Sequence, residues 1–259
     1  MRQQVTVRDT EVFIQKSLSV EDRFKISVAL PYGYDKNDIR YPVLYVMDSN
    51  IFFNLVVDTA RLLQFGREIP ELIIVGIGYE DNDMHMSLRD RDYLPTACEM
   101  SSYSGGAKEY LAFLEKELIP LINGNYRTDS QETTLFGDSY SGLFGLFALF
   151  NTDNLFNRYI IGSPSIYWDD AVIFDYEKNY NDINDDIQGR VFMSVGALEA
   201  IQEPAFAKMV DNVITMNQRL VGREYPNLKL TTHVFPDESH LSVIPATVSR
   251  GLRTVFRKV

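Results

Sequence analysis

Ser139 stands at the end of an apolar run, in a segment whose small residues are spaced for a sharp turn. Gly137 precedes it by two positions, and a helical pattern starts directly after it. A strand, a tight turn and a helix in this order are the context of a nucleophile elbow, which presents a serine hydroxyl above a sheet. The usual motif is G-x-S-x-G, and Ser141 occupies the place of the second glycine. Taken alone, the segment leaves two interpretations open, a nucleophile elbow or an ordinary turn between strand and helix.

A serine hydroxyl needs a base to take its proton near neutral pH, and histidine suits that task. His240 follows the last predicted strand and precedes the final predicted helix, and Glu199 lies just beyond the strand predicted over 191–196. Alone, each fits a surface role, as a solvated loop histidine or a charge at a helix start. Serine, acid and histidine in this chain order, each after a strand, are typical of the triad of an α/β-hydrolase. We therefore predict a relay in which Glu199 orients the imidazole of His240 toward Ser139.

Acyl transfer also needs hydrogen-bond donors for the oxyanion that forms in the transition state. The backbone N–H of Tyr140, directly after the serine, is the first predicted donor. The second is expected from the loop after the strand over 43–47, where Asn50 is the first choice and Ser49 the next. Ser49 is also counted among the substrate-binding residues.

The elements that must position these residues follow an α/β pattern. Short apolar runs alternate with segments of helical period, which predicts an α/β-hydrolase fold with a mostly parallel central sheet and helices on both faces. Apolar and smaller or polar residues alternate over 24–30, which predicts a strand and an antiparallel N-terminal hairpin over about 11–31. Residues 174–189, rich in Asp and Asn, are interpreted as a polar surface excursion, and one domain is expected over 1–259. The predicted buried strands are 43–47, 72–77, 134–137, 159–162, 191–196 and 230–235, and helices are predicted over 110–122 and from near Ser141, Ala205 and Ser242.

Composition excludes several classes of partner and site. The formal net charge is −11, which makes nucleic acid and anionic membranes poor partners. The single cysteine, Cys98, and the lack of a Cys/His cluster give no zinc site, and no metal or organic cofactor is implied. The first residues lack an apolar signal core, which predicts the cytoplasm, or the periplasm if a signal peptide has been removed. The oligomeric state stays open.

Four further segments form a recognisable set together with His240: YPVLYVMD at 41–48, RDYLPT at 91–96, SPSIYW at 163–168 and GALE at 196–199. With these segments the chain resembles the Putative esterase (esterase D-like) family of the α/β-hydrolase superfamily over nearly its whole length. The closest likeness is to the trilactone-siderophore esterases. This resemblance implies a serine carboxylic-ester hydrolase that works through an acyl-enzyme on a small-molecule ester.

The resemblance also implies two further substrate-binding residues. Arg91 would lie at the mouth of the site, where its fork could hold an anionic acyl group. The alternative for Arg91 is an ion pair with Asp92 or another neighbour that pins the loop. Trp168 would line the acyl pocket together with Tyr140, and packing is the alternative for both.

Three positions depart from the family pattern. Asp138 stands where a histidine is usual before the nucleophile, and Ser141 and Ser49 replace glycines of the elbow and of the oxyanion loop. We expect the Asp138 side chain to point away from the developing oxyanion. Two other functions stay open: acyl transfer or thioester hydrolysis on the same triad, and a catalytically inactive fold that serves as a binding module.

Overall fold

The computed structural model describes residues 5–80, 85–201 and 208–257. Its strands form one eight-stranded sheet in the order β1-β2-β4-β3-β5-β6-β7-β8. The pairs β1–β2 and β2–β4 are antiparallel, and all other pairs are parallel. The predicted fold class and the N-terminal hairpin are therefore confirmed. The strands are β1 (Thr10–Lys16), β2 (Arg23–Ala29), β3 (Tyr41–Val46), β4 (Ile73–Tyr79), β5 (Thr128–Asp138), β6 (Arg158–Gly162), β7 (Gly189–Gly196) and β8 (Leu228–Phe235).

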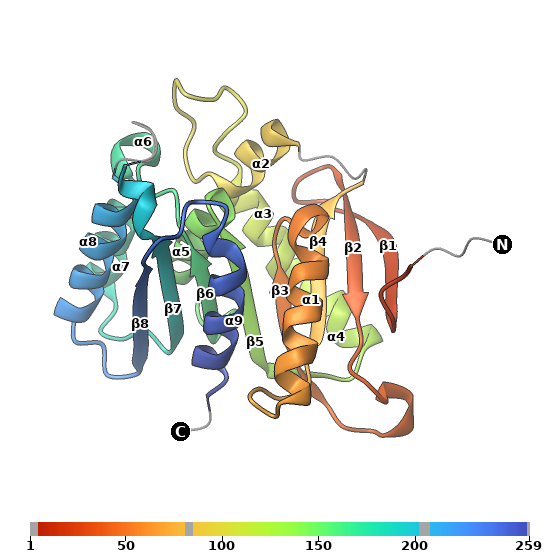
Figure 1. Cartoon of the computed structure of the whole chain (residues 1–259). Coiled ribbons are helices and arrows are strands. Elements are labelled where there is room, and N and C mark those ends of the chain that lie inside the picture. The colour runs from red at the N-terminus through yellow and green to blue at the C-terminus, as the bar shows by residue number, and fades with distance from the viewer. Residues whose placement is uncertain (1–4, 81–84, 202–207, 258–259) are drawn as a thin grey trace.

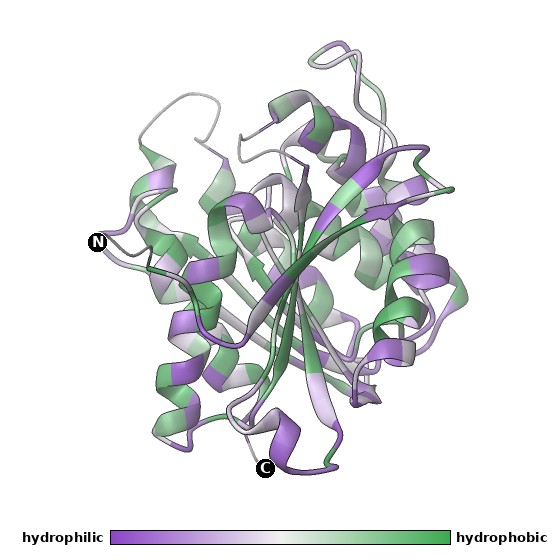
Figure 2. Ribbon diagram, turned by 90° about the vertical axis from the view of Figure 1, so that its right-hand side faces the viewer, coloured by the Kyte–Doolittle hydropathy of each residue, from purple (hydrophilic) through white to green (hydrophobic). Residues whose placement is uncertain are grey.

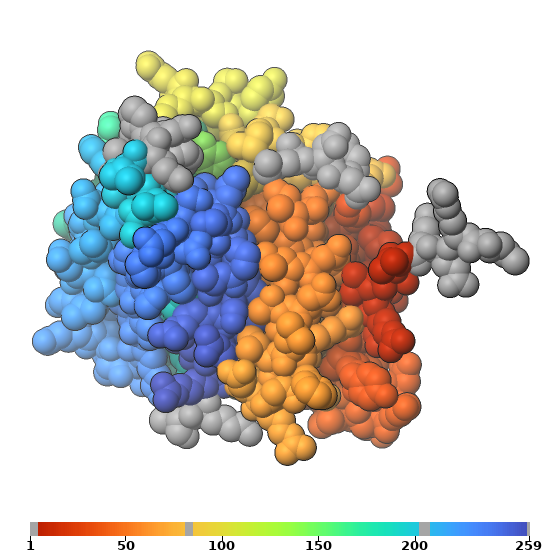
Figure 3. Space-filling view, in the orientation of Figure 1, coloured from red at the N-terminus to blue at the C-terminus, as the bar shows by residue number. Residues whose placement is uncertain are grey.

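Helices cover both faces of the sheet (Figure 1). On one face, α1 (Ser49–Phe65) and α9 (Val243–Val255) lie side by side, as the orange and blue surfaces of Figure 3 show. Figure 2 shows the apolar strands enclosed by helices that carry their polar residues outward. Burial of these apolar faces is the main stabilising contribution. The other face is covered by α3 (Ala107–Phe113), the π-helical η2 (Leu114–Leu118), α4 (Ile119–Asn125), α5 (Tyr140–Asn151), α7 (Ile173–Ile183) and α8 (Met209–Gly222).

Short elements complete the chain. Two of them, α2 (Met86–Tyr93) and α6 (Trp168–Ala171), lie above the carboxyl edge of the sheet (Figure 1). The 3-10 helices are η1 (Tyr34–Lys36) and η3 (Ala197–Ala200). Within the described part of the chain, no helix combines the length and the apolar character that a membrane span requires.

One prediction about an element is wrong, because residues 49–52, expected in a loop, form the first turn of α1. The polar segment 174–189 lies mostly at the surface, but it contains most of α7, a helix that the composition did not show. Glu177 of this helix is fully buried, and its carboxylate pairs with Arg219 and Arg223, one within α8 and one directly after it. The helix start expected near Ala205 lies outside the described residues.

Candidate active site

Ser139 occupies a sharp turn between β5 and α5. Its φ of 60° and ψ of −118° are unusual for a residue with a side chain, and such strain concentrates at functional sites. The turn needs glycine at Gly137, where an added Cβ would lie 2.2 Å from the carbonyl oxygen of Ser141. Gly142 is equally constrained, since its Cβ would lie 2.5 Å from the carbonyl oxygen of Gly162. The local backbone therefore has the geometry of a nucleophile elbow.

The structure brings the three predicted relay residues together, although they are far apart in the sequence. His240 Nε2 lies 3.1 Å from Ser139 Oγ, and His240 Nδ1 lies 2.7 Å from Glu199 Oε2. Both distances are those of hydrogen bonds. The arrangement allows the imidazole to accept a proton from the serine while the glutamate holds the ring.

Glu199 is fully buried and rigidly held. Its Oε1 accepts the Gly196 N–H at 2.7 Å and the Ser163 hydroxyl at 2.6 Å, which leaves Oε2 for His240. The Leu198 N–H donates to the carbonyl of Glu238 and ties η3 to the histidine loop. Ser163, which also has a positive φ, was not predicted as a functional residue, although it lies in the SPSIYW segment.

Electrostatics favour charge on the imidazole of His240. Burial opposes that charge, but the hydrogen bond to Glu199 and the nearby carboxyl groups of Asp138 and Glu199 outweigh it and raise the pKa of His240 above its ordinary value. The imidazolium that forms during serine attack is therefore stabilised by its surroundings.

A buried network lies beneath the elbow. The Ser141 hydroxyl accepts the Asp138 N–H at 2.9 Å and donates to Asp48 Oδ2 at 2.7 Å. Arg89 grips the same carboxylate with two bonds, from Nε at 2.7 Å and from Nη2 at 3.1 Å. Serine at the second glycine of the motif thus links the elbow to the end of β3 and, through Asp48 and Arg89, to α2.

The arginine that belongs to this network is Arg89, which sequence reasoning missed. Arg91 is held by Asp92 and Asp22 at 2.7 Å each, which matches its ion-pair alternative, and its role in substrate binding stays a prediction. The Arg89 guanidinium also lies 5.5 Å from the centre of the Tyr140 ring. The available signal was Asp48, a carboxylate directly after a buried strand that needs a cationic partner.

The predicted oxyanion donors lie at the same edge of the sheet. Tyr140 begins α5, and Asn50 lies in the first turn of α1. The Asn50 amide is clamped to the end of β4, with Oδ1 accepting the Tyr79 N–H at 2.8 Å and Nδ2 donating to the Tyr79 carbonyl at 3.2 Å. This clamp holds the start of α1 against the sheet. The role of both backbone N–H groups stays a prediction.

The Ser49 side chain is buried, and its predicted role in substrate binding stays a prediction. This side chain is buried against β4, where a Cβ on Gly76 would lie 2.6 Å from its Cβ and one on Gly78 would lie 2.6 Å from its Oγ. A residue in the first turn of a helix that packs on a sheet must turn one side inward, and here that side carries Ser49.

Trp168 makes packing contacts, and its role in lining the acyl pocket stays a prediction. It is 2% exposed, donates from Nε1 to the Thr96 carbonyl at 3.2 Å, and meets the Tyr140 ring edge-on at 5.9 Å. Tyr140, half-buried, therefore lies between Trp168 and Arg89 beside the nucleophile. A further residue that sequence reasoning missed is Ser165, whose buried Oγ lies 3.3 Å from Ser139 Oγ.

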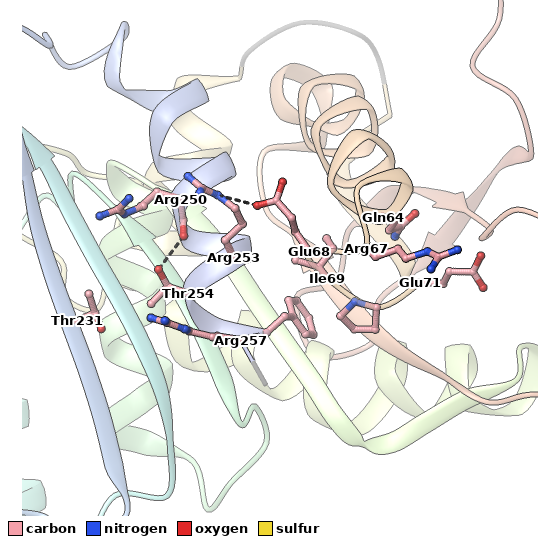
Figure 4. A pocket seen from close by; sticks show the side chains of 12 residues that line it. Gln64, Arg67, Glu68, Ile69, Glu71, Thr231, Arg250, Arg253, Thr254 and Arg257 are labelled. Carbon is pink, nitrogen blue, oxygen red and sulfur yellow. Dashed lines mark hydrogen bonds and ion pairs between the residues drawn. The ribbon is translucent and has the colours of Figure 1, made fainter. Parts of the chain in front are cut away.

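A large cavity of about 950 Å³ lies away from the relay, between the C-terminal ends of α1 and α9 (Figure 4). Four arginines line it: Arg67, Arg250, Arg253 and Arg257. None of the relay residues reaches this groove. Cavity size alone would therefore misplace the chemistry of this molecule.

Comparisons with known proteins agree with this geometry. The sequence model of the Putative esterase family matches residues 17–239. The chain is 32% identical to the ferri-bacillibactin esterase BesA of Bacillus subtilis, over 96% of this chain and 90% of that protein. It is 29% identical to the siderophore triacetylfusarinine C esterase of Aspergillus fumigatus, over 90% and 88%. The crystal structure of BES protein from Bacillus cereus superposes with a TM-score of 0.88 at 28% identity, covering 100% of this chain and 98% of that one.

Proposed function

This chain belongs to the Putative esterase family and is an ester hydrolase, and we propose that it cleaves the ester bonds of a siderophore through an acyl-enzyme on Ser139. The observation that carries the mechanism is the continuous relay from Ser139 Oγ through His240 to Glu199. The relatives named for siderophore esters support the substrate class.

The first half of the reaction forms the acyl-enzyme. Ser139 Oγ attacks the ester carbonyl carbon while its proton passes to His240 Nε2. The tetrahedral oxyanion accepts hydrogen bonds from the backbone N–H groups of Tyr140 and Asn50. His240 then gives its proton to the leaving alcohol oxygen as the C–O bond breaks, and the acyl group stays on the serine.

The second half repeats these steps with water. His240 takes a proton from water as the water oxygen attacks the acyl carbon, and returns that proton to Ser139 Oγ as the carboxylic acid leaves. Glu199 keeps the imidazole in one tautomer throughout. Its Oε1 is held by Ser163 and Gly196, and its Oε2 accepts the hydrogen bond from His240 Nδ1. The relay ends the cycle in its starting state, without a co-reactant other than water.

The test is hydrolysis of short p-nitrophenyl esters and of a trilactone siderophore, with and without iron, by the wild type and by Ser139→Ala. Loss of a triad member lowers turnover by about 10⁴-fold or more. Product analysis with competing alcohols and thioesters separates hydrolysis from acyl transfer. Near wild-type turnover by Ser139→Ala contradicts the mechanism, and turnover of simple esters without cleavage of any trilactone contradicts the substrate class.

A further inference from the structure

Asp138 is a buried carboxyl group that the mechanism above does not use. It ends β5 directly before the nucleophile and is 2% exposed. Its Oδ1 has no hydrogen-bond partner among the residues that the structure describes. The side chain lies over Gly162 of β6, where an added Cβ would come within 2.2 Å of Oδ1. A glycine at this position of β6 makes the space that the carboxyl group occupies.

The lack of partners distinguishes Asp138 from the neighbouring buried carboxylate. Asp48 is just as buried but accepts two bonds from Arg89 and one from Ser141. An unpaired buried carboxylate is costly, and burial raises the pKa of Asp138 to about 7.

The charged groups that interact with Asp138 come from four elements around it. Asp138 directly precedes Ser139, whose Oγ lies 3.1 Å from His240 Nε2, so the imidazole in the loop before α9 is close to Asp138. His240 attracts the Asp138 carboxylate from that loop, and Arg89 attracts it from α2. Glu199 after β7 and Asp48 after β3 repel it. Arg89 already makes two bonds to Asp48, so of these two attracting groups we take the imidazolium of His240 as the one on which Asp138 acts.

We propose that Asp138 is a positioning residue that acts through His240, as a second carboxylate that stabilises the imidazolium formed while Ser139 is attacking. The inference rests on the proposed function and adds a group to the relay. Glu199 holds the ring by a hydrogen bond, whereas Asp138 acts on its charge without touching it. The Asp138 side chain lies over Gly162 of β6, and the expectation that it points away from the developing oxyanion stays a prediction.

Two coupled titrating groups lose protons in steps that belong to the pair. The wild-type His240 signals should therefore show a broadened or two-step titration by NMR. Only three histidines are present, so a His240→Ala spectrum assigns the signal. In Asp138→Asn the same signal should titrate in a single step, with a midpoint lower by roughly one pH unit.

The acidic limb of the pH profile of kcat/KM reports protonation of the His240 imidazole in the free enzyme. This limb should therefore shift by the same amount as the NMR midpoint. At a pH well below the limb, the ratio of kcat/KM to its plateau value should rise about tenfold in Asp138→Asn. The matched control is Asp237→Asn, which removes the same charge from the exposed part of the histidine loop. This control should shift the acidic limb of kcat/KM and the His240 NMR midpoint by no more than about 0.2 pH units, because exposed charges are screened.

The outcomes separate this inference from the proposed function. Fluorophosphonate labelling of Ser139 should persist in Asp138→Asn, because the serine, histidine and glutamate are all present. A His240 midpoint and acidic limb that do not move, with labelling intact, overturn the role of Asp138 alone. Wild-type protein that takes no label overturns the mechanism itself. A single-step wild-type titration also contradicts the role, without any variant.

Discussion

The two ends of the sheet use charged residues in opposite ways. At the carboxyl edge, Arg89 and Asp48 have side chains only 7% and 2% exposed and hold one another at 2.7 Å. In the arginine-lined groove, Arg253 and Glu68 are 40% and 50% exposed and lie 3.8 Å apart. Figure 4 shows this looser pair reaching across the groove. Buried pairs fix geometry, whereas exposed pairs contribute little, so charge alone does not mark a site.

Of the substitutions that compare the carboxyl edge with the arginine-lined groove, the largest expected effect is on turnover. Glu199→Gln should lower kcat by about 10³–10⁴-fold, because the amide no longer holds the imidazole in the productive tautomer. The matched change in the groove, Glu68→Gln, should leave kcat unchanged. Steady-state kinetics on a p-nitrophenyl ester checks both. Equal losses in the two variants would show that the two ends are not functionally distinct.

The next effect is on stability. Arg89→Ala leaves Asp48 buried without its cation and should lower the free energy of unfolding by about 3–5 kcal/mol. Arg253→Ala removes an exposed partner and should cost less than about 1 kcal/mol. Urea unfolding followed by circular dichroism measures both values. A small loss for Arg89→Ala would mean that the network beneath the elbow is not what holds α2.

The raised pKa of Asp138 predicts that the free energy of unfolding falls as the pH rises. Its pKa is near 3.8 when unfolded and about 7 when folded, so the folded state binds more protons between these values. Its contribution to stability is present below about pH 4 and is lost as the pH rises through about 7. Asp138→Asn should remove this loss and be more stable than the wild type at pH 8 by about 2–4 kcal/mol. Urea unfolding of the wild type and of Asp138→Asn at pH 4 and pH 8 tests this prediction. An equal change in the free energy of unfolding for the two proteins would refute it.

The smallest expected effect on activity comes from Ser163, which supports Glu199 in the relay. Ser163→Ala removes one of the two donors on Glu199 Oε1 and should lower kcat/KM by about tenfold, with little change in KM. Ser104→Ala, which removes a hydroxyl that donates to the Ser101 carbonyl, is the control and should have no effect. A tenfold rise in KM instead would place Ser163 in substrate binding.

Much of this organisation could be predicted from the sequence. Apolar runs identified the parallel strands, because strands buried on both faces must be apolar throughout. The order of Ser139, Glu199 and His240 predicted which side chains meet, since the carboxyl ends of parallel strands share one edge. Whether one domain spans 1–259 and whether Asn50 binds the oxyanion remain predictions.

What could not be predicted depends on contacts between distant segments. Asp48 and Ser141 are 93 positions apart, and nothing local shows that they share a hydrogen bond. Arg89 and Arg91 look alike in the sequence, and only the packing of α2 decides which of them turns inward. The amino-acid composition of 174–189 likewise does not show that Glu177 is buried and pairs with Arg219 and Arg223.

The most direct test of the central claim is mass spectrometry of the folded protein after reaction with a fluorophosphonate. The relay predicts one adduct per chain, located on Ser139 and absent from Ser139→Ala. It also predicts much slower labelling in His240→Ala. Folded wild-type protein that takes no adduct, or that carries it on Ser165 or another residue, would contradict the relay.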